Sequence, residues 1–222
     1  MTDIHSLRSR TINKVPSPSN TSTVVYWMSR DQRILDNWAL LFAQDVALER
    51  KQPLIIVFVL SPSFLGATLR QYDFMINGLK EIEKQAMELN IQFKVLVGDP
   101  ANEIIKFCHE SGVSCLISDF SPLKIKSAWS CYIQKNLDIP FYEIDTHNII
   151  PCWEASDKQE YAAYTFRPKI TRKLDYFLTD IPSLKKHPFI PSINSSCDWR
   201  KLYEQLEVDT SVNPTDIVPG YK

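Results

Sequence analysis

The chain has 222 residues, of which 44% are hydrophobic, so it is long enough to bury the core of one domain and to carry an appended segment. A formal net charge of −1 excludes a strongly basic field over the whole chain, but it is compatible with a local basic patch. The five cysteines are odd in number, widely spaced and without a CxxC pair. This pattern argues against a disulfide framework or a zinc site and predicts an intracellular protein, cytoplasmic or, in a eukaryote, nuclear.

Residues 1–22 are rich in Ser, Thr, Asn and Pro and contain no apolar stretch of the kind found in secretory signals. We therefore expect a disordered N-terminal arm. No run in the chain approaches the roughly 18 apolar residues of a membrane span, so no membrane partner is expected.

From residue 23 to residue 150, short apolar runs alternate with longer amphipathic runs. The predicted strands are 23–28, 54–60, 92–97, 115–118 and 141–144, and the predicted helices are 33–50, 71–90, 101–111 and 123–137. Short runs rich in Val, Ile, Leu and Phe are typical of parallel strands that are buried on both faces. The alternation predicts an α/β domain, a Rossmann-like, doubly wound, five-stranded parallel sheet with helices on both faces.

Residues 151–222 break this pattern. Residues 152–177 are interpreted as helix or loop with a mixed charged face, and 198–206 as one short helix. Three prolines between residues 181 and 194 exclude a continuous helix there. We expect a connector that is partly helical and partly irregular.

The common nucleotide-binding and hydrolase motifs are absent from the sequence. There is no GxGxxG after the first strand, no GxxxxGK[ST], no GxSxG and no HExxH, and the chain has only five glycines. The four histidines lie far apart without the spacing of metal ligands. The ordinary dinucleotide, triphosphate and zinc sites are therefore disfavoured, and no metal site or catalytic residue is assigned.

Two polar turns follow predicted strands at the carboxyl edge of the sheet, where ligands bind beside a switch in strand order. The first contains Ser29, Arg30, Asp31, Gln32 and Arg33, and the second is 119–121. Two polar turns that face one crevice would suit a planar small molecule with polar edges. The same residues would also suit helix caps and local ion pairs. Asn37 is a poor residue for a helix interior, and a buried Asn at such a position usually holds a neighbouring loop.

A stretch after Pro151 interleaves aromatic and basic side chains. Such a surface can bind nucleic acid, but nearby acids offset the bases here, which favours a surface for docking another domain. The candidate docking or DNA-side residues are Lys158, Tyr161, Arg167 and Lys169.

Three segments resemble one known family. VVYWMSRDQRILDNWALLFAQ resembles the first strand and helix of the photolyase/cryptochrome superfamily, specifically the class II cyclobutane pyrimidine dimer (deoxyribodipyrimidine) photolyases. HNIIPCWEASDKQEYAAYTFRPKI resembles a second signature of that class, and FLTDIPSLKKHPF with DWRKLYEQLEVDTSV resembles its interdomain connector. One departure is Tyr164, where the class generally carries a basic residue.

The resemblance implies an α/β domain that holds a light-harvesting antenna chromophore of deazaflavin or folate type. The residues expected to line the antenna crevice are Met28, Ser29, Arg30, Asp31, Asn37, Asp119, Phe120 and Ser121. In complete members a helical domain binds FAD, flips the damaged bases out of DNA and splits the dimer with light.

The printed chain stops about where class II members begin that FAD domain. We therefore expect the FAD-binding helical domain to be absent and these residues to be incompetent for repair alone. The partner would be a flavin-binding photolyase domain, in cis for a fragment or in trans for a split enzyme, and damaged DNA would be reached only through it. The alternatives are a stand-alone α/β module that binds a small ligand or a protein, and a nonfunctional truncated remnant.

Overall fold

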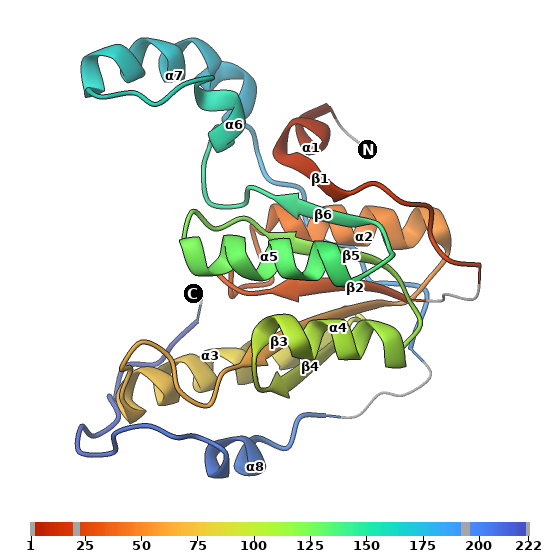
Figure 1. Ribbon diagram of the computed structural model, residues 1–222, viewed down its shortest axis with the longest axis vertical. Helices are drawn as coiled ribbons and strands as arrows, with labels where there is room; N and C mark the ends of the chain where they lie inside the picture. The colour runs from red at the N-terminus through yellow and green to blue at the C-terminus, as the bar shows by residue number, and fades with distance from the viewer. Residues whose placement is uncertain (1–2, 20–22, 192–195, 221–222) are drawn as a thin grey trace.

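The structure is a computed structural model that describes residues 3–19, 23–191 and 196–220. Its centre is a six-stranded sheet in the order β1-β6-β5-β2-β3-β4 (Figure 1). Strands β2 (Thr23–Met28), β3 (Leu54–Leu60), β4 (Gln92–Val97), β5 (Val113–Asp119) and β6 (Phe141–Ile144) pair in parallel. The doubly wound α/β class is confirmed, but the sheet has one more strand than predicted.

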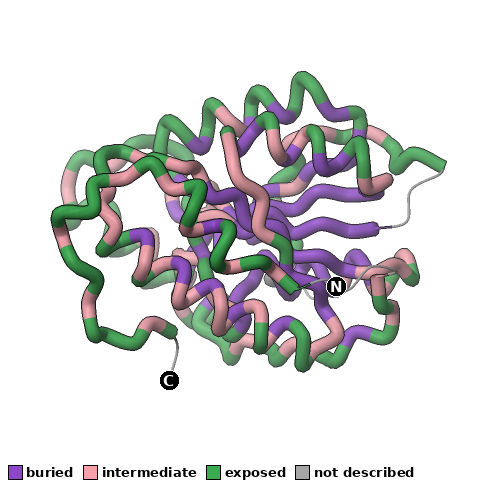
Figure 2. Tube along the Cα trace, turned by 90° about the horizontal axis from the view of Figure 1, so that it is seen from below, coloured by how far each residue is buried: buried purple, intermediate pink, exposed green. Residues whose placement is uncertain are grey.

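Helices cover both faces of the sheet because successive residues of each strand point to opposite sides. On one face, Val24, Tyr26 and Met28 pack against α2 (Trp38–Arg50) and α3 (Leu69–Glu88). On the other face, Val25 and Trp27 pack against α4 (Pro100–Glu110) and α5 (Lys124–Asn136). Figure 2 shows the strands buried in the middle, with exposed residues along the outer helices.

The sixth strand lies in the segment predicted to be a disordered arm, so that prediction is wrong for residues 3–13. They form α1 (Asp3–Arg8) and β1 (Ser9–Asn13), and β1 pairs antiparallel with β6 at the sheet edge. The polar composition suggested disorder, but polar side chains of this segment, such as those of Arg8 and Arg10, form hydrogen bonds with residues of the folded domain. Part of the predicted arm, residues 1–2 and 20–22, lies outside the described residues.

Arg8 shows how this segment is attached. Its side chain is buried, and its guanidinium donates hydrogen bonds to the backbone oxygens of Asp145 (3.2 Å), Asn148 (2.7 Å) and Ile149 (2.5 Å). It also lies 4.7 Å from the ring centroid of Trp38. Burial lowers the pKa of Arg8 to about 10, while Asp145 acts in the opposite direction.

The helix expected to begin at residue 33 begins at Trp38 instead. Asn37 has an extended backbone, and its side-chain oxygen accepts a hydrogen bond from the backbone N–H of Leu40, so Asn37 is the N-cap rather than an interior residue. Its side-chain N–H donates to the backbone oxygens of Asp31 (3.2 Å) and Arg33 (2.9 Å). The prediction that Asn37 holds a neighbouring loop is confirmed.

The C-terminal segment alternates short helices with irregular chain. It contains α6 (Cys152–Ala155), α7 (Ala163–Phe177) and α8 (Trp199–Glu204). Residues 181–191 contain no helix, and the prediction for 192–194 lies outside the described residues. Lys185 exchanges backbone hydrogen bonds with the Gln44 side chain, and the Trp199 indole donates to Glu83 at 2.7 Å. The segment therefore crosses the face of the domain that carries α2 and α3.

Within the described part of the chain, no helix is long and apolar enough to cross a membrane.

We predict that Arg8→Ala lowers the free energy of unfolding by about 3 kcal/mol, because it leaves buried carbonyl oxygens without their donor. Urea unfolding of the wild type and the variant measures the difference. Lys14→Ala is the matched control, because it removes an exposed basic side chain from the same segment, and it should change the value by less than about 0.5 kcal/mol. Equal effects of the two substitutions would contradict the proposed role of Arg8.

Candidate functional site

The two predicted turns meet through one carboxylate. Asp119 is fully buried, and its Oδ2 accepts hydrogen bonds from the backbone N–H groups of Ser29 (3.0 Å), Arg30 (2.7 Å) and Asp31 (2.7 Å). Because β2 and β5 are neighbours in the sheet, the turn after β2 closes over the end of β5. The predicted closeness of the two turns is confirmed. Asp119 itself is the last residue of β5, where it pairs with Ile144, rather than a turn residue.

The buried side chains of Asp31 and Asn37 support the turn after β2 from its inner side. The Asp31 carboxylate lies 2.8 Å from Nε of Arg33, and the Asn37 side chain donates to the Tyr26 hydroxyl at 3.2 Å. Burial raises the pKa of Asp31 to about 6, while the nearby Arg33 guanidinium acts in the opposite direction. Burial is also the main reason that the pKa of Tyr26 lies well above its usual value.

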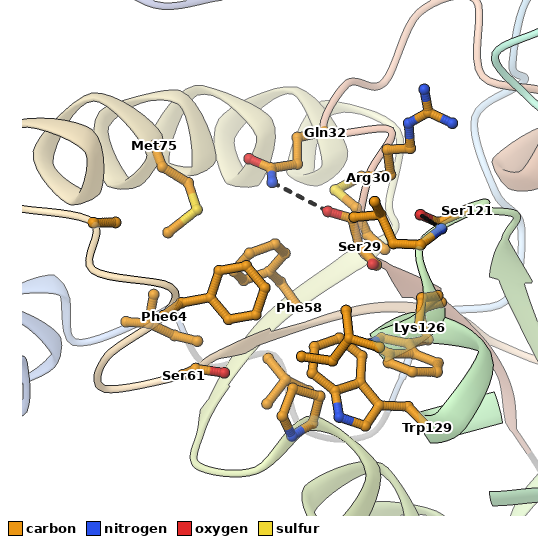
Figure 3. Close-up of a pocket in the computed structure, with 18 of the residues that line it drawn as sticks. Ser29, Arg30, Gln32, Phe58, Ser61, Phe64, Met75, Ser121, Lys126 and Trp129 are labelled. Carbon is orange, nitrogen blue, oxygen red and sulfur yellow. Dashed lines mark hydrogen bonds between the residues drawn. The ribbon is translucent and has the colours of Figure 1, made fainter. Parts of the chain in front are cut away.

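A cavity of about 310 Å³ lies beside this turn, at the carboxyl ends of β2 and β3 and between α3 and α5. Of the eight residues expected to line the crevice, Met28, Ser29, Arg30 and Ser121 line it, and so does Gln32 of the first polar turn. Figure 3 shows Ser29, Arg30, Ser121 and Lys126 gathered at one side of the cavity, with Phe64 and Met75 at the opposite side. The position of the cavity agrees with the rule that ligands bind at the switch in strand order.

The other four predicted crevice residues do not line the cavity. Asp31, Asn37 and Asp119 are buried beneath the turn, where their polar atoms hold its backbone. Phe120 packs edge to face on Trp153, with 5.6 Å between the ring centroids, and Arg10 lies over both rings. The side chain of Phe120 therefore belongs to the contact between β1 and α6.

Sequence reasoning missed most of the cavity wall. The missed lining residues are Trp27, Phe58, Val59, Leu60, Ser61, Phe64, Ala67, Gln71, Tyr72, Met75, Pro100, Leu123, Ile125, Lys126 and Trp129. Applying the carboxyl-edge rule to the second predicted strand would have found Phe58 and the loop after it. No pattern distinguished Lys126 or Trp129 from the other residues of their helix.

Lys126 is the most unusual side chain of the wall. It is 2% exposed, and its Nζ lies 3.2 Å from the ring centroid of Trp27 and 3.7 Å from Oδ1 of Asp119. Burial lowers the pKa of Lys126 to about 8, while Asp119 and Glu143 act in the opposite direction. The ammonium is therefore held in the apolar wall mainly by one carboxylate and one aromatic face.

The predicted docking residues lie elsewhere, around α6 and α7, and none of them lines the cavity. Tyr161 is 91% exposed, and Lys158 and Arg167 are exposed as well. Lys169 differs, because its Nζ lies 2.7 Å from Glu160 and 3.5 Å from Asp157. Hydrogen bonds, first of all from Lys169, lower the pKa of Glu160 to about 2. In Figure 1, α7 extends away from the sheet.

No cluster of three or more His, Cys, Asp or Glu side chains that could hold a metal ion occurs among residues 3–19, 23–191 and 196–220.

The comparison with protein families matches residues 24–187 to DNA photolyase. The chain belongs to the DNA photolyase family. It is 46% identical over 191 residues to the deoxyribodipyrimidine photo-lyase of Potorous tridactylus, which covers 85% of this chain and 36% of that protein. It is 41% identical over 172 residues to the Arabidopsis thaliana enzyme of the same name, covering 77% and 35%.

Among solved structures, the chain is similar to an archaeal photolyase from Sulfolobus tokodaii, described as holding two FAD molecules, with the implication of a novel light-harvesting cofactor. The TM-score is 0.63 at 17% identity, and the match covers 86% of this chain and 43% of that one. This likeness supports the fold. The chain spans little more than a third of the length of the two curated relatives above.

We predict that Asp119→Asn lowers the free energy of unfolding by about 2–4 kcal/mol, because it weakens hydrogen bonds to a charged acceptor and leaves Lys126 without its nearby carboxylate. Denaturant unfolding measures the effect. The exposed Asp138→Asn is the control and should be nearly neutral.

Adding Lys126→Met to Asp119→Asn should restore part of the loss, because the uncompensated buried charge is then removed. Additive losses in the double variant would contradict the coupling of the two side chains.

Proposed function

We propose that this chain is the antenna-chromophore-binding N-terminal domain of a class II DNA photolyase, an enzyme class that repairs cyclobutane pyrimidine dimers with light. The observation that carries the proposal is the aromatic-walled cavity at the switch in strand order, in a chain of the DNA photolyase family. Its volume, about 310 Å³, lies at the lower end of the range for small-molecule sites. The names of the curated relatives support the reaction class.

The residues of the cavity suit a planar chromophore. Phe58, Phe64 and Trp129 supply aromatic surface, while Ser29 and Ser121 supply hydroxyl groups at one end. The proposed occupant is of deazaflavin or folate type, and it would supply light absorption. The protein has to hold the ring in one orientation and exclude water, which an apolar wall with a few polar groups does.

Expression of the chain in cells supplied with deazaflavin or folate tests the antenna role. We expect the purified protein to carry an absorption band beyond about 350 nm, where protein side chains do not absorb. Ala67→Trp places a large ring in the cavity wall and should abolish the band, whereas Tyr161→Ala on the distant exposed surface should retain it. A wild-type protein that purifies without chromophore would contradict the antenna proposal. An absorption band that persists in Ala67→Trp would contradict it as well.

The second part of the proposal concerns the partner. A flavin-binding photolyase domain would dock, in cis or in trans, on the surface around Lys158, Tyr161, Arg167 and Lys169, and damaged DNA would be reached through that domain. The exposure of Tyr161 (91%) and Tyr164 (79%) supports a docking surface, because large aromatic rings are enriched at interfaces.

A repair assay and a binding assay test whether this chain needs a separate flavin-binding domain. We expect residues 1–222 with FAD and light to leave pyrimidine dimers in DNA intact, and a class II flavin domain added in trans to bind the chain. Tyr161→Ala should weaken that binding at least several-fold, whereas Tyr132→Ala, an exposed ring on α5, should not. Dimer repair by residues 1–222 alone would contradict the proposal.

A further inference from the structure

Residues 7–10, where α1 continues into β1, contact both helices of the proposed docking surface. The Trp153 indole of α6 donates a hydrogen bond to the backbone oxygen of Leu7 at 2.7 Å. Phe177 of α7 is buried in a cluster that includes Leu7, and the Arg8 guanidinium lies 5.7 Å from the Phe177 ring centroid. Figure 1 shows α1 and β1 beside α6, at the edge of the sheet. The N-terminal segment therefore connects these two helices to the sheet.

Arg10 anchors this segment on the sheet. In the antiparallel pair of β1 and β6 it lies directly opposite Glu143, and its Nε donates a hydrogen bond to the Glu143 carboxylate at 2.8 Å. Glu143 is buried, and burial raises the pKa of Glu143 while Arg10 acts in the opposite direction. A buried carboxylate is unfavourable without a partner, so this ion pair holds the Arg10 side chain in place.

The guanidinium of Arg10 also contacts two aromatic rings from different parts of the fold. Its Cζ lies 5.2 Å from the ring centroid of Phe120, at the end of β5, and 5.2 Å from that of Trp153 in α6. The two rings pack edge to face, with 5.6 Å between their centroids. Because a guanidinium is planar, its contact with an aromatic face fixes an orientation as well as a distance. Arg10 therefore joins β1, β6, the end of β5 and α6.

Helices α6 and α7 are held to each other by polar contacts. The Lys173 ammonium donates a hydrogen bond to the backbone oxygen of Glu154. Lys169 donates to the Ser156 hydroxyl oxygen at 2.9 Å and forms an ion pair with Glu160 at 2.7 Å. The position of α6 against the sheet therefore decides the position of the exposed surface on α7.

We propose that Arg10 is a positioning residue for partner docking, because its contacts with Phe120 and Trp153 fix α6, and with it α7, in one orientation against the sheet. Arg10 lies outside the proposed docking surface and acts on it through Trp153. The part of this inference that concerns the partner rests on the proposed function. A surface that is held in one orientation before binding loses less conformational entropy on binding, so its partner binds more tightly.

Hydrogen exchange of residues 1–222, followed by mass spectrometry, tests the positioning without a partner. We expect Arg10→Met to accelerate exchange of the amides of residues 152–177 about tenfold and to leave the amides of β2, β3 and β5 unchanged, because only the contact of α6 with the sheet is lost. Arg10→Lys keeps the charge opposite Glu143 without the planar stack, so it should show most of the same acceleration. Lys14→Met removes an exposed cation from the same segment and should behave like the wild type.

Phe120→Leu tests the same contact from its other side, because it removes one ring and leaves Arg10 and Glu143 in place. It should accelerate exchange of the same amides, so the test holds even where Arg10→Met fails to fold. Unchanged exchange of residues 152–177 in Arg10→Met or in Phe120→Leu would overturn the proposal. Equal acceleration throughout the sheet would overturn it as well, because it would show a general loss of stability.

Titration with a class II flavin domain in trans tests the consequence for docking. We expect Arg10→Met and Arg10→Lys to weaken binding about fivefold or more, whereas Lys14→Met should leave it unchanged. Wild-type affinity in both Arg10 variants would overturn the proposal. Failure of the flavin domain to bind the wild type would count against the proposed function alone, because the exchange measurement decides the positioning role by itself.

Discussion

The site depends on a single carboxylate oxygen. Oδ2 of Asp119 accepts three backbone hydrogen bonds from the turn after β2, and this contact closes the carboxyl end of the sheet where the strand order switches. Charged acceptors make stronger hydrogen bonds than neutral ones, and burial protects them from competition by water. The position of the turn then places Ser29 and Arg30 at one end of the cavity.

Burying that carboxylate has a consequence for its neighbours. An isolated buried charge is unfavourable, and Lys126 supplies the opposite charge from α5, at 3.7 Å. The pair is only partly satisfied, because Asp119 gives its best hydrogen bonds to the turn. The carboxylate that holds the turn is therefore also the group that keeps a buried ammonium beside the cavity.

The N-terminal and C-terminal segments brace the domain from outside the sheet. Arg8 joins α1 to the loop after β6, and the Trp153 indole donates to the backbone oxygen of Leu7 at 2.7 Å, so α6 is attached to the same segment. Phe177, at the end of α7, is buried in a small cluster near Leu7. Much of the rest of α7 stays exposed.

The sequence alone determined the parts of the fold that depend on local patterns. Four of the five predicted strands have the observed bounds, because short runs rich in Val, Ile, Leu and Phe form the strands of a parallel sheet. The helix predicted from residue 101 begins one residue earlier, at Pro100, where Asp99 caps it by accepting a local hydrogen bond from the backbone N–H of Asn102. The switch-point rule located the edge of the sheet where the cavity lies and the meeting of its two turns, and the resemblance identified the family.

Only the tertiary structure decided which side chains face the cavity and which hold it together. Asp119 is a polar residue at the right edge, yet its partners are backbone N–H groups 88 to 90 residues away in the sequence, so the sequence could not show that it points inward to the turn. Strand β1 forms because Arg8 and Arg10 find partners more than 130 residues away. Lys126 looks like any lysine on an amphipathic helix, and its burial against Trp27 exists only once the sheet and α5 have packed.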